Sequence, residues 1–399
     1  MNDRAPSFVA AAVSHIGNVR QHNEDAHLVD VDHGTFMVCD GMGGHAAGEV
    51  ASALAVAVVG ERWSGAEVDH AVGAWAAHRT AEARRALFNA LRVGVLAAHE
   101  RIVAESDADP RKRGMGTTFL GLKVAGGDAV LAHAGDSRAY LVRDGIAIQL
   151  TEDHTLLARL ASAGIDIAAI GSTSRWKGVL TNALGMGEDT RIATFAVPLA
   201  GGDRFLLCTD GVSEYVDEAE VGEVLSTLGS PEHAAQRLID FALERGGADN
   251  ATAVVIEVIE PGVTQVPVAQ RQRDDAALAR SPLLAGLTAP QRLRALRIAL
   301  ERELPAGSPV PAEAFGDRIA WIVLDGEVDR AGTVHRAGDL VYPGSLLAGN
   351  PRMDRAELGV TLGDVRALAI RRDDFGELTS DEPDLAAPLF HALGELVRR

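Results

Sequence analysis

Short apolar runs alternate with longer alanine-rich stretches along residues 1–259 of the 399-residue chain. Several of these runs alternate apolar and polar residues or are continuously apolar, as half-buried and fully covered strands are. The runs are TFMVCD, TTFLGLKV, AVLAHAGD, AYLVRDGIAIQL, RFLLCTD and TAVVIEVIE, and the start of the chain also favours a strand. The pattern predicts a set of strands interrupted by helices.

Two alanine-rich stretches are long enough to form helices. They are GEVASALAVAVVGERW and TAEARRALFNALRVGVLAAHERIVAE, and the second places Leu87, Leu91 and Val95 on one stripe. Neighbouring strands are joined by a Gly-Gly pair at 126–127 and an Asp-Gly pair at 144–145. Such short turns favour antiparallel hairpins over parallel crossovers. We therefore expect antiparallel sheets that are covered by helices.

Residues 260–282 break this pattern, because periodicity is lost while prolines and clustered charges appear. This composition is typical of a linker between a first domain, 1–259, and a second domain, 283–399. The second domain is predicted to be a smaller α+β domain with a Thr-x-x-Gln capping box at 288–291 and an Asp-Gly turn at 325–326. Its closing helix repeats an apolar residue every four positions, at Leu385, Leu389, Leu393 and Val397.

Composition restricts the partners and the compartment. The formal net charge is -18, so a nucleic-acid partner would be repelled through its phosphates. The longest apolar stretch, ASALAVAVV, is far shorter than the roughly 18 residues that span a bilayer, so we expect no membrane segment. The two cysteines, Cys39 and Cys208, suit a reducing compartment. The expected location is therefore the cytoplasm.

Acidic residues recur where apolar runs meet glycine or another small residue. These acids are Asp40, Asp136, Asp210 and Asp249, with Glu24 and Asp25 beside a further strand-like run. A single Asp-Gly pair would usually be a hairpin turn. Several such acids at strand ends could instead converge at one edge of a sheet sandwich. Carboxylates gathered there would repel one another unless a cation held them.

The type of cation follows from the type of ligand. Oxygen ligands without a Cys/His set at zinc spacing favour magnesium or manganese over zinc or copper. Gly41, directly after Asp40, has no side chain, so its carbonyl could approach an ion closely. Two ions bridged by an acid would activate a shared water for the hydrolysis of a phosphate ester. Arg20 would supply a further positive charge for the phosphate.

Eight motifs, in order, resemble those of the metal-dependent, type 2C (PPM) serine/threonine protein phosphatases. They are GNVRQHNED, VCDGMGGHAAGE, GMGTTFLGLKV, GDSRAYL, LTEDHTL, LTNALG, LCTDGVSEYV and ADNATAVVIEV, and they cover roughly residues 8–259. An ordered set of motifs is far more specific than a single motif. The resemblance implies an α+β fold, a four-layer α-β-β-α sandwich of two antiparallel sheets, with a binuclear metal centre at one edge.

The resemblance also implies metal-binding roles. Asp40 resembles the acid that bridges two Mg²⁺ or Mn²⁺ ions, and Gly41 resembles the carbonyl ligand of the second ion. Asp210 and Asp249 resemble ligands of the first ion. Asp136 resembles the ligand of a third, weaker ion that bacterial members of the family share between this acid and Asp210.

The catalytic set that the resemblance implies comprises Asp40 and three residues of GNVRQHNED. Arg20 resembles the clamp for the substrate phosphate, and Glu24 and Asp25 resemble residues that orient metal-bound waters, with Asp25 also counted in the metal site. A segment from about 155 to 187 would form a flap beside the site. Met42 stands where many eukaryotic members have a histidine that is a proposed general acid, which leaves the proton donor to the leaving group open; a metal-bound water could serve.

Residues 283–399 resemble a cyclic-nucleotide-binding β-roll with flanking helices, in motif order and hydrophobic pattern. A working nucleotide site needs amide donors and an arginine for the cyclic phosphate, and a glutamate for the ribose. Here Pro343 removes an amide donor, no glutamate lies between 339 and 350, and Arg352 or Arg355 would have to bind the phosphate. We therefore expect a regulatory or protein-docking domain that binds no cyclic nucleotide.

Together these features predict a phosphatase for phosphoserine and phosphothreonine in proteins, which opposes a serine/threonine kinase and carries a regulatory domain. Two alternatives stay open at this point: a non-catalytic signalling scaffold with the same fold, and a phosphatase controlled by a cyclic nucleotide. The acids at 40, 136, 210 and 249 argue against the scaffold, because a decayed site would have little reason to retain mutually repelling carboxylates. The altered nucleotide motif argues against the sensor.

Overall fold

The computed structural model describes residues 5–43, 47–162, 165, 176, 178–187, 189–263, 266–314, 316–347 and 358–398. The chain forms two compact units, Met1–Gln265 (unit 1) and Val266–Arg399 (unit 2). No helix in these described ranges is long and apolar enough to cross a membrane. The predicted division into domains at 1–259 and 283–399 stays a prediction, and each unit is described by itself.

Unit 1 contains two antiparallel sheets. The first has the order β1 (Ser7–His15), β11 (Ala251–Glu260), β10 (Arg204–Cys208), β7 (Arg138–Arg143), β8 (Ile146–Gln149). The second has the order β2 (Asp25–Asp30), β3 (Thr35–Met42), β5 (Phe119–Ala125), β6 (Asp128–Ala134), β9 (Ala193–Pro198), with β4 (Gly116–Thr117) beside β3. Every strand pair resolved in these sheets is antiparallel.

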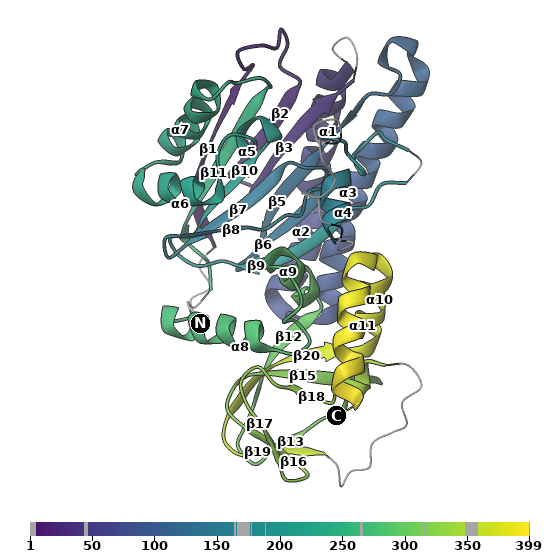
Figure 1. The fold of residues 1–399 in the computed structure, drawn as a ribbon, viewed down its shortest axis with the longest axis vertical. Helices are drawn as coiled ribbons and strands as arrows, with labels where there is room; N and C mark the ends of the chain where they lie inside the picture. The colour runs from purple at the N-terminus through teal and green to yellow at the C-terminus, as the bar shows by residue number, and fades with distance from the viewer. Residues whose placement is uncertain are drawn as a thin grey trace. The chain divides into compact units, whose positions relative to one another are not determined.

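Helices cover the outer face of each sheet (Figure 1). The second sheet packs against α1 (Ala47–Trp63), α2 (Ala66–His78) and α3 (Ala81–Ala108). The first sheet packs against α6 (Glu218–Thr227) and α7 (Pro231–Glu244). Short elements complete the unit: η1 (Pro110–Lys112), α4 (Leu156–Ser162) and α5 (Asp210–Ser213). The predicted four-layer α-β-β-α sandwich is confirmed.

The local signals that the sequence carries are realised in unit 1. Leu87, Leu91 and Val95 of α3 are fully buried. The hairpin turn at 144–145 has φ of 52° and 80°, which a β-branched residue would adopt only with strain. Both predicted hairpins form, β5 with β6 and β7 with β8.

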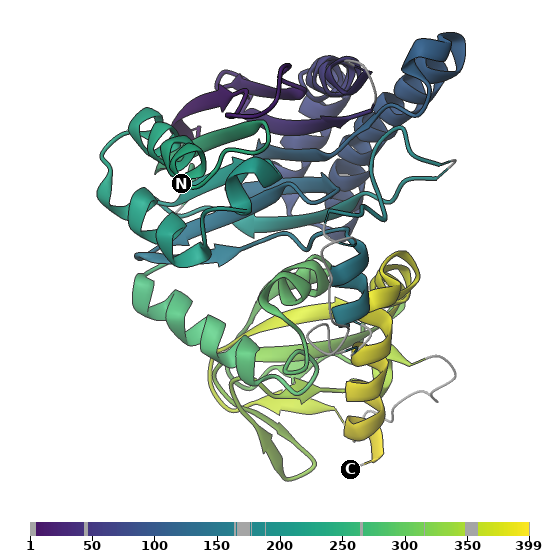
Figure 2. The same cartoon turned by 45° about the horizontal axis from the view of Figure 1, so that its top comes forward.

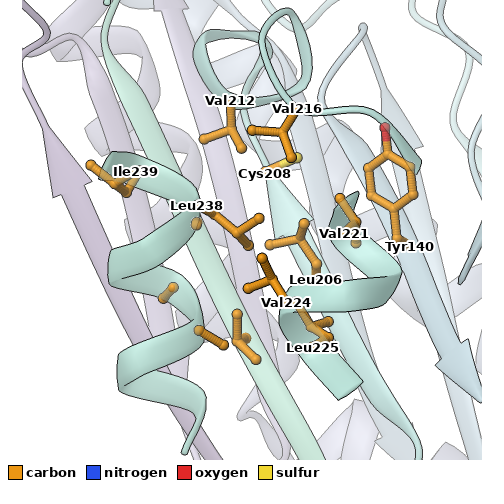
Figure 3. Close-up of a cluster of buried hydrophobic side chains, with 14 of the residues drawn as sticks. Tyr140, Leu206, Cys208, Val212, Val216, Val221, Val224, Leu225, Leu238 and Ile239 are labelled. Atoms are coloured by element: carbon orange, nitrogen blue, oxygen red, sulfur yellow. The ribbon is translucent and has the colours of Figure 1, made fainter. Parts of the chain in front are cut away.

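Figure 3 shows the apolar cluster that joins the first sheet to its helices. Leu206 of β10 packs among side chains that include Leu225 of α6 and Leu238 of α7, and all three are fully buried. Burying one leucine side chain contributes roughly 1.5–3 kcal/mol to folding. The cluster therefore fixes β10, the strand that leads directly to Asp210.

Unit 2 is a β-rich fold of two further antiparallel sheets. One has the order β12 (Ala299–Leu304), β20 (Val365–Arg371), β15 (Asp317–Asp325), β14 (Glu313–Ala314), with β18 (Leu340–Val341) paired to β15. The other has the order β13 (Pro309–Val310), β19 (Gly359–Thr361), β16 (Val328–Arg330), β17 (Thr333–His335). The helical elements are α8 (Val268–Arg280), α9 (Ala289–Leu296), η3 (Pro343–Leu346), α10 (Arg372–Asp381) and α11 (Pro383–Arg398). Figure 2 shows α10 and α11 beside these strands.

Two sequence signals in unit 2 have different outcomes. Thr288 and Gln291 form the predicted capping box of α9. In α11, Leu385, Leu389 and Leu393 are buried as expected, but Val397 is 47% exposed. A spacing of four residues exceeds the 3.6 residues of one helical turn, so the stripe rotates steadily away from the core.

The segment predicted as a linker, 260–282, contains helix α8. Ala277 of this helix is fully buried, and Arg366 of β20 donates a 2.5 Å hydrogen bond to Asp274. These contacts attach α8 to the sheet of unit 2. The segment is therefore not an irregular linker throughout: its prolines lie outside α8, and its clustered charges lie on this helix.

Candidate functional site

Strand pairing brings the acids of unit 1 to one edge of the sandwich. In the β2–β3 pair, Asp25 lies directly opposite Asp40. Asp136 precedes β7, Asp210 follows β10 and Asp249 precedes β11. Because β10 is antiparallel to both β7 and β11, the start of each neighbour lies beside the end of β10. The structure thus brings together the acids that the sequence analysis singled out.

Asp25 and Asp210 each present a buried carboxylate oxygen without a hydrogen-bond partner. Thr209 and Thr252 donate hydrogen bonds of 2.9 and 2.7 Å to Oδ2 of Asp25, but its Oδ1 has no donor. Oδ1 of Asp210 also has none. Burial raises the pKa of Asp25 to about 7 and that of Asp210 to about 6, and nearby acids such as Asp249 add to both shifts.

The backbone around Asp40 is held in place by Thr118. The Thr118 hydroxyl accepts a 2.9 Å hydrogen bond from the Asp40 amide, and the Thr118 amide donates one of 2.9 Å to the Asp40 carbonyl. Burial, and then the charges of Asp25, Asp210 and Asp136, raise the pKa of Asp40 well above its ordinary value. Burial, and then Asp210, raise the pKa of Asp136 to about 7. These four carboxyls therefore repel one another when they are ionised.

Gly41 occupies a space that no side chain could share. A Cβ atom there would lie 2.3 Å from the Gly48 carbonyl oxygen and 2.5 Å from that of Glu24. The Gly41 amide donates a 3.1 Å hydrogen bond to the same Glu24 oxygen. Glycine is therefore required at this position for the close approach of three backbone segments.

Arg20 lies at the exposed rim of the acid cluster. Its Nη2 donates a 2.6 Å hydrogen bond to Oδ2 of Asp249, and the two side chains are 49% and 33% exposed. Burial raises the pKa of Glu24, while the positive charge of Arg20 opposes that shift. Arg20 therefore forms its ion pair with the outermost acid, Asp249, and its charge acts more weakly on Glu24 and Asp40.

The donor set fits hard metal ions. Asp25 and Asp210 have unpartnered buried oxygens, and their carboxyl pKa values are raised by burial and then by neighbouring acids, which a bound cation would offset. In the ranges that the structure describes, no group of three or more His, Cys, Asp or Glu side chains is arranged so that it could hold an ion. Mg²⁺ commonly retains several waters and uses one or two carboxylates, so the residues suit hydrated ions rather than a cage of side chains.

The sequence analysis missed the polar residues that hold the acids. Thr209, Thr252 and Asn250 are almost completely buried and contact Asp25 or the segment before it. Each lies next to or near a predicted metal ligand, as in the pairs Thr209-Asp210 and Asp249-Asn250. A polar residue next to an acid at a strand end was the sequence feature that could have identified them.

Other predicted features lie beside the cluster or beyond the described ranges. Met42 ends β3 and pairs with Gly116 of β4. Burial raises the pKa of both Cys39 and Cys208, so these thiols are un-ionised core residues. Much of the expected flap at 155–187, and both Arg352 and Arg355, lie outside the residues that the structure describes.

An antiparallel sandwich with a carboxylate cluster at one edge defines a class of metal-dependent phosphatases, and comparison with known proteins agrees. The model of the protein phosphatase 2C family matches residues 13–243, which is more than half of the chain. The chain therefore belongs to the protein phosphatase 2C family, as the motifs predicted. The match ends before Asp249.

The similar proteins are bacterial phosphatases. The serine/threonine protein phosphatase PstP of Mycobacterium tuberculosis is 34% identical over 322 residues, which cover 78% of this chain and 57% of PstP. The serine/threonine phosphatase stp of Listeria monocytogenes is 34% identical over 244 residues, which cover 60% of this chain and 92% of stp. This chain thus spans little more than half the length of PstP.

Solved structures carry the same fold. The catalytic domain of PstP in complex with two manganese ions is 32% identical, with a TM-score of 0.54, and the match covers 64% of this chain and all of that domain. A structure of the Mycobacterium tuberculosis PstP/Ppp phosphatase gives the same identity and TM-score over 63% of this chain. The prediction of Mg²⁺ or Mn²⁺ as the cofactor of this family is confirmed.

Proposed function

We propose that unit 1 hydrolyses phosphoserine and phosphothreonine in proteins with the help of two Mg²⁺ or Mn²⁺ ions. The observation that carries this proposal is the pair of buried, unpartnered oxygens on Asp25 and Asp210, within a cluster that includes Asp40. When bound, the ions supply positive charge for the substrate phosphate and acidify a water. The relatives named above, which are serine/threonine phosphatases, support the proposal.

The residues of the chain would divide the work. Asp40, Asp210 and Asp249 would hold the two ions together with the Gly41 carbonyl. Asp136 and Asp210 would together hold a weaker third ion. The two acids are close, because the charge of Asp210 is the second contribution, after burial, to the raised pKa of Asp136.

The phosphate would bind at the outer side of the cluster. Arg20 uses one donor for Asp249 and is half exposed, so it keeps guanidinium donors for a phosphate. Thr209 and Thr252 keep Asp25 facing the ions, and Glu24 would orient water at the rim.

We further propose that unit 2 is a regulatory or protein-docking domain of the cyclic-nucleotide-binding type that binds no nucleotide. Tyr342 supports this view, because its side chain is 2% exposed and packs in an apolar cluster that includes Trp321 and Val328. Its hydroxyl donates to the Val310 carbonyl at 3.0 Å and accepts from the Gly359 amide at 2.6 Å. In the cell, we expect a cytoplasmic enzyme that opposes a serine/threonine kinase.

A direct assay tests the catalytic proposal. The purified full chain should release phosphate from a phosphothreonine peptide when Mn²⁺ or Mg²⁺ is present, and this activity should disappear with a chelator. A non-catalytic scaffold would show no metal-dependent turnover with any phosphopeptide. Turnover that persists in chelator would equally contradict the proposed chemistry.

A further inference from the structure

The segment that carries Arg20 is a loop without regular structure of its own. It joins the end of β1 at His15 to the start of β2 at Asp25, and residues 18–22 are exposed. An arginine side chain also has large rotamer freedom. The position of Arg20 relative to the acids must therefore be fixed by contacts from outside the loop.

One buried side chain supplies these contacts. The Asn250 Oδ1 accepts a 2.8 Å hydrogen bond from the Glu24 amide. Its Nδ2 donates hydrogen bonds of 2.9 Å to the carbonyls of Ile16 and His22. Asn250 is 4% exposed, so a single amide group ties the beginning and the end of the loop to the residue that follows Asp249.

The chemistry of the amide group matches this task. The loop offers one backbone donor and two backbone acceptors, and an asparagine presents one acceptor and two donors. Aspartate would lose both donations and add a charge beside Asp249. A smaller side chain would leave three partly buried backbone groups of the loop without these partners, and an unsatisfied buried group costs more than the bond itself contributes.

Asn18 forms a second, more exposed anchor for the same loop. Its Nδ2 donates hydrogen bonds of 3.0 and 3.1 Å to the carbonyls of Leu243 and Gly246. A Cβ atom on the neighbouring Gly17 would lie 2.2 Å from the Asp249 carbonyl oxygen. The loop is therefore pressed against the turn between α7 and β11.

We propose that Asn250 is a positioning residue for the phosphate-binding arginine. By fixing the loop 16–24 to the segment that leads from Asp249 into β11, it keeps Arg20 and Glu24 at a set place beside the acid cluster. The catalytic consequence rests on the proposed function of unit 1. The positional consequence does not, and the two can be measured separately.

Hydrogen–deuterium exchange of the full chain tests the positional consequence. In Asn250→Ala, we expect the hydrogen-bonded amides within 16–24, those of Gly17, Asn18 and Glu24, to exchange about tenfold faster or more, because three hydrogen bonds that hold the loop are lost. Asn182→Ala is the matched control, since Asn182 accepts from the amide and donates to the carbonyl of Arg191. It should leave exchange at 16–24 unchanged.

Kinetics test the catalytic consequence. Asn250→Ala should lower kcat/KM for a phosphothreonine peptide about 10- to 100-fold. In an Arg20→Ala background the same change should cost about threefold or less, because a residue that acts through Arg20 has little left to position. Asn250→Asp, which keeps the acceptor and loses the donors, should not restore the parent value.

The outcomes separate the two hypotheses. If the parent chain has no phosphatase activity, the proposed function fails, while faster exchange at 16–24 still supports the anchor. If the parent is active but exchange is unchanged, or the losses from Asn250→Ala and Arg20→Ala simply multiply, the positioning role is wrong. Asn18→Ala guards against misfolding of the buried variant, because this exposed change should also accelerate exchange at 16–24, and an unchanged rate there would overturn the anchored-loop account.

Discussion

The acid cluster of unit 1 and the buried acids Glu382 and Asp317 of unit 2 differ in the partners of their carboxylates. In unit 2, Glu382 is 2% exposed and accepts a hydrogen bond from Arg294, with Arg297 3.3 Å away. Asp317, 3% exposed, lies 3.5 Å from Arg372 and accepts a hydrogen bond from the Arg318 amide. Each of these acids is matched by a permanent cation of the chain.

In the acid cluster of unit 1, by contrast, the carboxyls face one another, although unit 1 also contains the buried ion pairs of Asp128 with Arg79 and of Asp203 with Arg143. Burial and neighbouring carboxylates raise the pKa values of Asp25, Asp40 and Asp210. Arg20 forms its ion pair with the outer acid, Asp249, and its charge also acts on Glu24 and Asp40. The buried carboxylates Glu382 and Asp317 each have an arginine partner, whereas the carboxyls of Asp25, Asp40 and Asp210 have mainly one another as charged neighbours. Clustered acids with raised pKa values are typical of functional sites, where the missing charge comes from a ligand.

The largest effect should follow from removing one acid of the unmatched cluster. Asp40→Asn should lower metal-dependent hydrolysis by about a thousandfold or more, since a charge that holds the ions and substrate is lost. The metal-free variant should remain folded and at least as stable as the parent, because one repelling charge has gone. Peptide hydrolysis and thermal unfolding in chelator measure the two effects. Near-normal turnover would remove Asp40 from the site.

Breaking an ion pair of unit 2 should have the opposite effect: stability should fall while activity is unchanged. Arg294→Met should leave peptide hydrolysis unchanged but destabilise unit 2 by about 1.5–3 kcal/mol, because Glu382 loses its hydrogen-bonded arginine and keeps only the charge of Arg297, 3.3 Å away. Hydrogen exchange of β15 and β20 against denaturant measures this loss. The double change Arg294→Met with Glu382→Leu should recover much of the stability. A larger loss in the double variant would show that the pair itself is strongly stabilising.

The pH dependence of stability should reveal the raised pKa of an acid in the cluster of unit 1. Asp136, with a pKa near 7 in the metal-free fold, retains its proton where the unfolded chain has already lost it. Its contribution to stability is therefore full below about pH 4 and is lost as pH rises toward 7. In chelator, Asp136→Asn should become more stable than the parent by about 1–3 kcal/mol over this window. A difference that is independent of pH would contradict the raised pKa.

The smallest effect should come from removing unit 2. A chain that ends at residue 265 keeps Val263, which packs beside Gly127 of unit 1. Its kcat on a small phosphopeptide should match the full chain within about twofold, since the acid cluster lies wholly in unit 1. Cyclic AMP or cyclic GMP should alter neither chain. A large change in kcat on truncation would instead make unit 2 a direct regulator of the site.

The sequence predicted the sandwich because strand periodicity and turn residues are local signals. The sequence pattern did not predict helix α8, because α8 is attached to unit 2 through a hydrogen bond between Asp274 and Arg366, which are 92 positions apart. Likewise, Tyr342 adopts the left-handed conformation, with a φ of 61°, which a sequence pattern does not predict for a non-glycine residue. Tertiary contacts decide such features.

The site shows the same limit. The acids were predictable because each one stands at a strand end beside a small or polar residue, and their order matched a known family. Asn250 was not, because its partner Glu24 lies 226 positions away. Nor could the sequence tell which oxygens lack donors, since this depends on how Thr209 and Thr252 orient Asp25.

The most direct test of the unmatched cluster is a calorimetric titration of the full, metal-free chain with Mn²⁺. We predict at least two ions per chain, with protons released on binding near pH 6, because the carboxyls of Asp25 and Asp136 must ionise. Asp40→Asn should bind fewer ions. Absence of Mn²⁺ binding at millimolar concentration, or equal binding by Asp40→Asn, would contradict the account.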